Sequence, residues 1–306
     1  MLLLLCFAPY AASGVKNSLN MCFELILPSL FPFFVGCSLM NETGLSIKLG
    51  QKLSPLAAKL FGVSGVGATA FITGVTGGYP LGAAYIADLR KRECISSNEA
   101  SHLLSFCNNS GPAFIIGAAG YGIYSSVKVG FFLYFVHILS AMIYGVIIYP
   151  KAPFVGDIMP KAKNEKSFSS AVTASVKSAI TTSLSVCGFI MAFAVLSGIL
   201  TGTGILYQIA GEFSQFLGAE LQWCRVLLFG IIELGNGIGC MAGLSINPLN
   251  LALTAFLLGF GGVSVHFQTY AMISGTDIKA ARYIIGRLFV SLLGGSIALL
   301  GSFILF

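Results

Sequence analysis

The apolar stretch VGFFLYFVHILSAMIYGVIIY, which runs from Val129 to Tyr149, decides the class of this protein. A helix needs about 20 consecutive apolar residues to cross the hydrocarbon core of a bilayer, and this stretch has that length. Similar runs extend from Ser183 to Leu200 and from Leu288 to Phe306. The sequence therefore predicts an all-α polytopic membrane protein.

The composition agrees with a single membrane domain that fills residues 1–306. Hydrophobic residues make up 56% of the chain and charged residues only 9%, whereas a soluble domain carries about a quarter charged residues. The net charge is +6, but the basic residues are scattered among apolar segments and form no basic face that would bind nucleic acid. We therefore expect the lipid bilayer as a partner and no nucleic acid, and we leave a homo-oligomer open.

Signatures of enzymes and of metal sites are missing from the sequence. It contains no HExxH, GxSxG or P-loop pattern. The eight cysteines occur singly, without a CxxC pair or a Cys/His cluster at metal-ligand spacing. We expect no enzyme, no catalytic residue, no cofactor and no metal site.

Two glycine-rich breaks indicate an internal repeat. The segments TGVTGGYP (Thr73 to Pro80) and LGNGIGCM (Leu234 to Met241) both interrupt apolar stretches, and a shift of 161 residues superposes their glycines. Further on, LLSFCNNSGPAF (Leu103 to Phe114) aligns with LLGFGGVSVHFQ (Leu257 to Gln268) at a shift of 154 residues. Because the alignments occur in the same order, they predict two related halves.

Charge placement predicts how the halves are oriented, because cytoplasmic loops hold an excess of Lys and Arg. One orientation puts 14 of the 17 basic residues, Arg287 among them, on the cytoplasmic side and leaves Lys16, Lys128 and Arg225 outside. Each half then crosses three times, so the sequence predicts inverted-topology repeats with broken helices and re-entrant hairpins. The predicted segments are repeat one at about 15–150, a cytoplasmic linker at 151–177 and repeat two at about 176–306.

The breaks are also the predicted substrate site. A broken helix at membrane depth is tolerated only where it is buried in protein or lines a wet cavity, and the N-termini of half-helices attract anions. Pro80 and Pro112 are placed to begin two half-helices, with counterparts near Gly239 and Ser264. Such a site favours a small anion or a polar heterocycle. The predicted substrate-binding residues are Thr76, Gly77, Gly78, Asn108, Asn109, Ser110, Asn236, Ser264, His266 and Gln268.

Alternatives stay open at these positions. Glu233 either couples transport to a proton or another cation, as an ionisable group at membrane depth suggests, or pairs with Arg225. His137 is either a proton relay or a hydrogen-bonded packing residue. The glycines of the breaks also have the GxxxG spacing that permits close helix packing: Gly74 with Gly78, and Gly235 with Gly239.

At these same residues the chain resembles a known family. The resemblance rests on TGGYPLGA (Thr76 to Ala83), SFCNNSGPAFIIG (Ser105 to Gly117), the Glu-Leu-Gly break at Glu233 and GFGGVSVHFQ (Gly259 to Gln268). In these motifs the chain is similar to the nucleoside-recognition, or Gate, membrane family and, within it, to the YlbJ/SpoVV sporulation integral membrane proteins of endospore-forming Firmicutes.

The resemblance implies a fold similar to concentrative nucleoside transporters and a role in moving dipicolinic acid from the mother cell across the outer forespore membrane. Dipicolinate is a small planar dianion, which suits facing half-helix N-termini, although neither break contains an Arg or Lys to pair with a carboxylate. We expect alternating access in which one half rocks against the other. A nucleoside-like or ion-coupled carrier and a non-transporting spore-maturation protein remain alternatives.

Overall fold

The computed structural model describes residues 5–151, 153–154 and 167–305, and in these residues it contains helices and turns but no strand. The all-α prediction is therefore confirmed for the described part of the chain. The first half contains α2 (Ala8–Met21), η1 (Cys22–Ile26), α3 (Leu27–Glu42), α4 (Leu45–Phe61), α5 (Gly65–Gly77), α6 (Leu81–Lys91), α7 (Ser97–Cys107), η2 (Ala113–Ile123) and α8 (Val127–Ile147). The second half contains α9 (Phe168–Gly202), α10 (Ile205–Leu217), α11 (Leu221–Ile232), α12 (Leu234–Gly239), α13 (Pro248–Phe260), α14 (Gly262–Ile273) and α15 (Ala280–Leu305).

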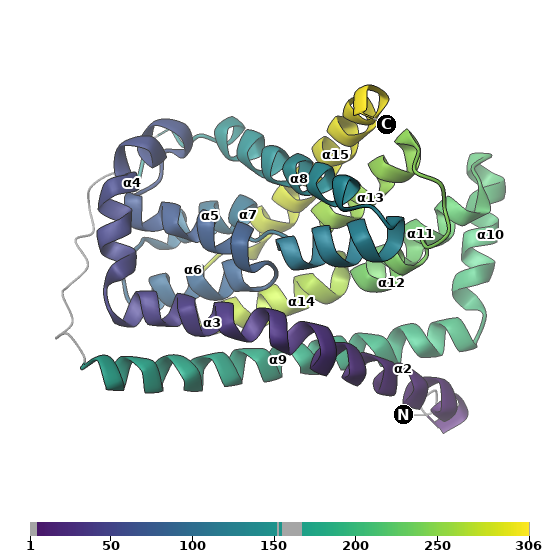
Figure 1. Cartoon of the computed structure of the whole chain (residues 1–306), viewed down its shortest axis with the longest axis horizontal. Coiled ribbons are helices and arrows are strands. Elements are labelled where there is room, and N and C mark those ends of the chain that lie inside the picture. The colour runs from purple at the N-terminus through teal and green to yellow at the C-terminus, as the bar shows by residue number, and fades with distance from the viewer. Residues whose placement is uncertain (1–4, 152, 155–166, 306) are drawn as a thin grey trace.

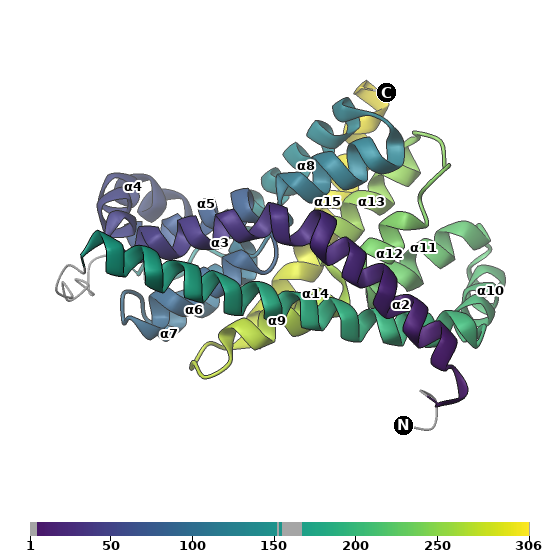
Figure 2. The ribbon, with the colours of Figure 1, turned by 60° about the horizontal axis from the view of Figure 1, so that its bottom comes forward.

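The helices form two layers along the long axis of the molecule (Figure 1). In one layer α2, η1 and α3 join end to end and pack along α9; we call it the α3/α9 layer. The other layer contains α5 to α8 and α11 to α15, and we call it the hairpin core. Figure 2 shows the α3/α9 layer running across the hairpin core. Each layer therefore combines helices from both halves of the sequence.

Several segments are long and apolar enough to cross a membrane, which confirms the polytopic prediction. Among the described residues they are Val127–Ile147, Phe168–Gly202, Pro248–Ile273 and Ala281–Leu305. α4 and α5 are also apolar but bend by 84° between them, and Figure 1 shows α4 and α10 lying across the long axis at opposite ends of the molecule.

Both predicted hairpins and both predicted broken helices are present. α5 and α6 pack against each other on either side of one break, and α11 and α12 on either side of the other. α7 is followed by η2, and α13 by α14. One prediction is wrong: the half-helix expected to begin near Gly239 begins at Leu234 and ends at Gly239, because Glu233 caps it.

The ends of the helices also bear on the repeat alignment. α5 ends at Gly77 and α11 at Ile232, a difference of 155 residues, and α7 ends at Cys107 and α13 at Phe260, a difference of 153. Both differences lie near the shift of 154 rather than 161. The inverted repeat itself stays a prediction.

Most of the predicted linker lies outside the described residues, and α9 already begins at Phe168.

Close packing at the glycines differs between the two breaks. A Cβ atom on Gly74 would overlap the carbonyl oxygen of Cys107, and one on Gly78 would lie 2.8 Å from the amide nitrogen of Gly111. In the second break, by contrast, a Cβ atom on Gly239 would meet nothing within 4 Å. The packing interpretation of GxxxG therefore holds for the first hairpin and not for Gly239.

This difference gives a prediction for stability. Gly74→Ala should lower the thermal unfolding midpoint of the purified protein in detergent, because overpacking against fixed backbone costs about 1–3 kcal/mol or more. Gly239→Ala is the matched control and should leave the midpoint within error. Equal midpoints for the two variants would mean that the hairpin does not pack against α7 as described.

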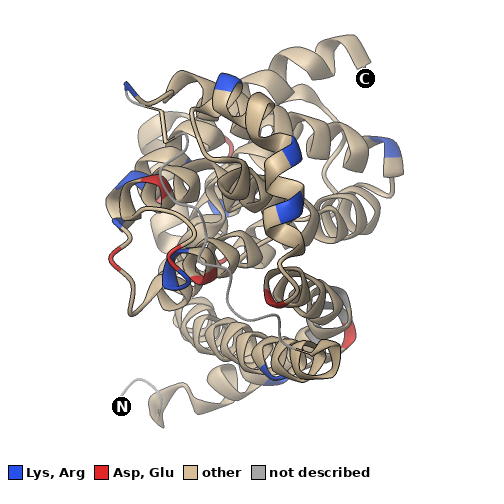
Figure 3. Ribbon diagram, turned by 90° about the vertical axis from the view of Figure 1, so that its left-hand side faces the viewer, with Lys and Arg blue, Asp and Glu red and all other residues tan. Residues whose placement is uncertain are grey.

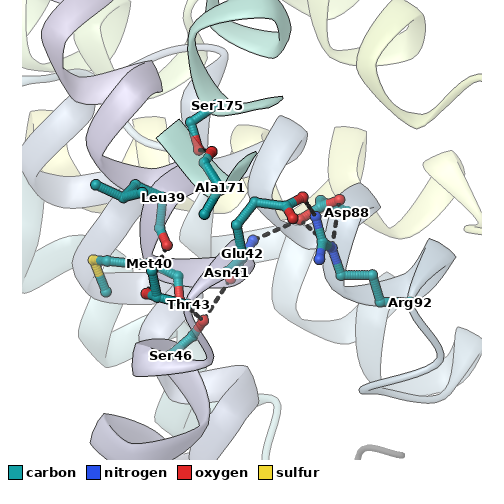
Figure 4. A network of polar contacts seen from close by, with 10 residues as sticks. All are labelled: Leu39, Met40, Asn41, Glu42, Thr43, Ser46, Asp88, Arg92, Ala171 and Ser175. Atoms are coloured by element: carbon teal, nitrogen blue, oxygen red, sulfur yellow. Dashed lines mark hydrogen bonds and ion pairs between the residues drawn. The ribbon is translucent and has the colours of Figure 1, made fainter. Parts of the chain in front are cut away.

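A polar clamp, formed by Asn41, Glu42, Asp88 and Arg92, ties the two layers together at one end of the molecule (Figure 4). The Arg92 guanidinium contacts the Asp88 carboxylate at 2.9 Å and the Glu42 carboxylate at 2.5 Å, and Asn41 Nδ2 donates to Asp88 Oδ2 at 2.6 Å. Asn41 and Glu42 end α3, whereas Asp88 belongs to α6. Any sliding of one layer along the other must break these bonds.

A second ion pair at the same end joins α6 to the loop before α15. Arg90 Nε lies 2.8 Å from Asp277 Oδ1, and the Arg90 guanidinium lowers the pKa of the Asp277 carboxyl to about 2. The pair therefore stays ionised at physiological pH. Figure 3 looks onto this end, where α4 carries Lys48, Lys52 and Lys59. It is the end that the charge distribution of the sequence predicts to be cytoplasmic, and this orientation stays a prediction.

Candidate functional site

A pocket of about 120 Å³ lies where the breaks of the hairpin core face the α3/α9 layer. We call it the central pocket. Leu30, Phe33, Val186 and Ile190 form its apolar wall on α3 and α9, and the breaks form the opposite wall. The volume suffices for several waters or one small solute.

The central pocket brings together predicted residues from both halves of the sequence. Six of them line it: Thr76, Gly77, Gly78, Ser110, Gln268 and Glu233. Gln268 is 4% exposed, and its Nε2 donates to Ser264 Oγ at 3.3 Å, so Ser264 orients a residue of the wall. The other predicted residues do not line the pocket: Asn108, Asn109, Asn236, Ser264 and His266.

Asn108 and His266 instead belong to a buried polar network behind the pocket. Asn108 Nδ2 donates to Thr269 Oγ1 at 2.8 Å, and Asn108 Oδ1 accepts from the Ala83 amide at 3.2 Å. His266 Nδ1 lies 3.0 Å from the Tyr283 hydroxyl, which also accepts from Thr269 at 3.1 Å. The network therefore links α6, α7, α14 and α15, and it joins the two halves of the sequence.

The remaining side chains near the breaks also have protein partners. Asn109 Nδ2 donates to the Phe106 carbonyl oxygen at 2.8 Å. His137 Nε2 accepts from the Ser110 amide at 3.0 Å, so the structure agrees with the hydrogen-bonded packing interpretation of His137. These bonds hold the break between α7 and η2 in one conformation.

Glu233 caps α12 and lines the central pocket. Its Oε1 accepts from the Gly235 amide at 3.0 Å and its Oε2 from the Asn236 amide at 2.7 Å. The predicted ion pair with Arg225 is not formed, because the Arg225 guanidinium lies over the Tyr207 ring, 5.0 Å from its centroid. Glu233 is the only Asp, Glu, Lys, Arg or His among the described residues that line the pocket.

The four half-helix N-termini at the breaks differ in whether protein side chains already occupy them. Asn108 bonds the Ala83 amide of α6, and Glu233 bonds two amides of α12. η2 and α14 have no side-chain cap. Pro112, Ala113 and Phe114, at the start of η2, line the pocket, whereas α14 lines it only with Val265 and Gln268, beyond its first three residues. First-turn amides have no partner within their own helix and attract anions. The pocket therefore offers one helix start, that of η2, to an anionic ligand.

Comparison with known proteins decides the family. No protein-family model matches the sequence. The sporulation integral membrane protein YlbJ of Bacillus subtilis (strain 168) is 30% identical over 305 residues, in an alignment that covers 89% of this chain and 73% of the relative. The chain belongs to the YlbJ family of sporulation integral membrane proteins.

A solved structure is similar to this YlbJ-family chain over most of its length. It is CNTnw, a concentrative nucleoside transporter, in its intermediate 3 state, with a TM-score of 0.56 and 15% sequence identity. The similarity covers 95% of this chain and 84% of the transporter. The expected likeness to the concentrative nucleoside transporter fold is confirmed.

One residue of this YlbJ-family protein was missed by sequence reasoning. Arg287, predicted to lie at the cytoplasmic surface, is fully buried in α15, about 10 Å along the helix from its start. Its Nε donates to the Gly259 carbonyl oxygen and its Nη1 to the Asn108 carbonyl oxygen, both at 2.8 Å. The available signal was a second Arg of α15, five residues beyond Arg282 and next to the apolar run that starts at Leu288, because charges inside spanning helices are costly and functional.

A second cavity of about 310 Å³ lies between α3, α6 and α9, beside the polar clamp. Asn41, Asp88 and other polar residues line it, together with Phe34 and Leu81. Phe34 and Leu81 pack in one apolar cluster with Val186, which lines the central pocket. The apolar cluster therefore borders both this second cavity and the central pocket.

Proposed function

We propose that this protein is a membrane transporter of a small anionic solute, and that the solute is dipicolinic acid, moved into the developing forespore. The observation that carries the proposal is the central pocket, in which the uncapped start of η2 and the Gln268 side chain of α14, from different halves of the sequence, face an apolar wall. The YlbJ family and the transporter fold support this proposal. Its site of action is then the outer forespore membrane, as the family resemblance implies.

The pocket chemistry suits a planar dicarboxylate. One carboxylate would lie at the start of η2, where the positive end of the helix dipole stabilises an anion, and the other on the side of α14, where Val265 and Gln268 line the pocket. Ser110 and Gln268 would donate hydrogen bonds between them. The planar ring would pack against the apolar wall of α3 and α9, which buries its faces.

We further propose alternating access in which the hairpin core moves along the α3/α9 layer. The bond between Asn108 and Thr269 and the bond from Arg287 to Asn108 join the two sequence halves inside the hairpin core. Rocking of one sequence half against the other would break these bonds. The two moving parts are therefore the hairpin core and the α3/α9 layer, not the two sequence halves. The apolar cluster and the polar clamp lie at the boundary between the layers, and in this proposal they close the cytoplasmic path.

The test is uptake of labelled dipicolinate into proteoliposomes. We expect saturable uptake by the wild type and a KM raised about tenfold or more in Gln268→Ala, because a hydrogen bond to a charged group contributes about 1.5–3 kcal/mol. Gln208→Ala, at an exposed glutamine of α10, is the matched control and should transport normally. Folded wild-type protein that shows no uptake under proton or sodium gradients of either direction would contradict the proposed function.

A further inference from the structure

Arg287 is a buried cation whose hydrogen bonds all go to neutral oxygens. The ion pairs of the described residues involve Arg90 and Arg92 and leave Arg287 without a carboxylate. Its guanidinium bonds the carbonyl oxygens of Gly259 and Asn108 and, at 3.3 Å, Asn109 Oδ1. A buried charge must be compensated, so these oxygens have to provide the compensation.

The two carbonyl oxygens belong to helix ends that carry negative charge. Asn108 is the C-terminal cap of α7, and Gly259 lies in the last turn of α13. Each helix C-terminus is equivalent to about half a negative charge, so two such ends balance one guanidinium. Arg287 therefore joins the breaks of both halves through their negative ends.

At each break a negative helix end is followed within a few residues by a positive one. η2 begins shortly after Asn108, and α14 begins at Gly262, directly after the break at Gly261. At so short a separation the two opposite ends largely cancel in their effect on a nearby ligand. Arg287 compensates only the negative ends, because its hydrogen bonds go to Gly259, Asn108 and Asn109 and to no group of η2 or α14. The positive end of η2 lies at the central pocket, which Ala113 and Phe114 line.

We propose that Arg287 is a positioning residue that sets the preference of the central pocket for anions by neutralising the C-terminal ends of α7 and α13. This inference rests on the proposed function and deepens it. Arg287 acts without touching the solute: the Tyr79 ring lines the pocket, and the guanidinium lies 5.5 Å from its centroid, outside the lining residues.

The experiment compares two ligands of the same shape and different charge. Binding of dipicolinate and of its neutral diamide, pyridine-2,6-dicarboxamide, is measured by calorimetry on the purified full chain. The variants are Arg287→Gln, which keeps a hydrogen-bond donor, and Arg287→Lys, which keeps the charge. Arg225→Gln is the control, because Arg225 lies over Tyr207 and away from the breaks.

We expect Arg287→Gln to weaken dipicolinate binding at least about tenfold, because helix ends in buried sites interact strongly with charges, and to leave diamide binding nearly unchanged. In Arg287→Lys the ratio of dipicolinate affinity to diamide affinity should be lower than in the wild type and higher than in Arg287→Gln. The comparison with the wild type tests the inference even if Arg287→Gln fails to fold. Equal weakening for both ligands, or an unchanged ratio in the folded variants, would overturn the inference. Wild-type protein that binds neither ligand would overturn the proposed function, and the inference with it.

Discussion

Replacement of Asn108 by alanine is expected to lower the free energy of unfolding by about 2–6 kcal/mol. Two buried polar groups would lose their hydrogen-bond partner, and each such loss costs about 1–3 kcal/mol. The Asn108 side chain accepts from the Ala83 amide and donates to Thr269, and it is fully buried. Total stabilities of about 5–15 kcal/mol are usual for soluble domains. The loss would therefore remove a large share of the stability, and it should lower the thermal unfolding midpoint and the yield of monodisperse protein in detergent.

The matched control is Asn236→Ala. Asn236 is only partly buried, and the bond described for it is donated by its backbone amide to Glu233. We expect its unfolding midpoint to equal that of the wild type. If Asn108→Ala were as stable as Asn236→Ala and failed only in solute binding, Asn108 would contact the solute and the network behind the pocket would be wrong.

Replacement of Glu233 by glutamine is expected to abolish accumulation of solute against a gradient. Glu233 is a carboxylate beside the solute, so a proton or cation bound to it would offset its repulsion of an anion. With one coupled ion, a tenfold ion gradient supports about tenfold accumulation, since 1.36 kcal/mol corresponds to a factor of ten. Glutamine cannot take up the ion, so accumulation should fall to equilibration while solute exchange across the membrane continues.

Accumulation and exchange are measured in the same proteoliposomes, with proton and sodium gradients applied separately. Glu212→Gln, at an exposed glutamate of α10, is the control and should accumulate solute like the wild type. Persistent accumulation in Glu233→Gln would assign Glu233 the role of a helix cap alone. Loss of both accumulation and exchange would instead point to a collapsed second break.

The spanning segments were predictable because their apolar length is set by the bilayer. The predicted span from Val129 to Tyr149 and the observed α8, Val127–Ile147, differ by two residues at each end. The hairpins were predictable too, since glycine and proline mark where a buried helix is interrupted. The start at Leu234 was missed because Glu233 was interpreted as a charge rather than as a cap.

The assignment of side chains to the pocket was only partly predictable. Outside regular helices no periodicity tells which way a side chain points, so Ser110 and Asn108, two residues apart, lie on opposite sides of one break. Arg287 was assigned to the surface because counting basic residues gives no depth along a helix. Arg287 can be buried because carbonyl oxygens far away in the sequence accept its hydrogen bonds. Only the fold brings these groups to it.

The most direct test is a cryo-electron microscopy map of the protein with saturating dipicolinate. The account predicts density for the solute in the central pocket, between Ser110 and Gln268, with one carboxylate at the start of η2 and with the Tyr79 ring between the solute and Arg287. A well-resolved map with this pocket empty, or with the solute bound elsewhere, would contradict the account.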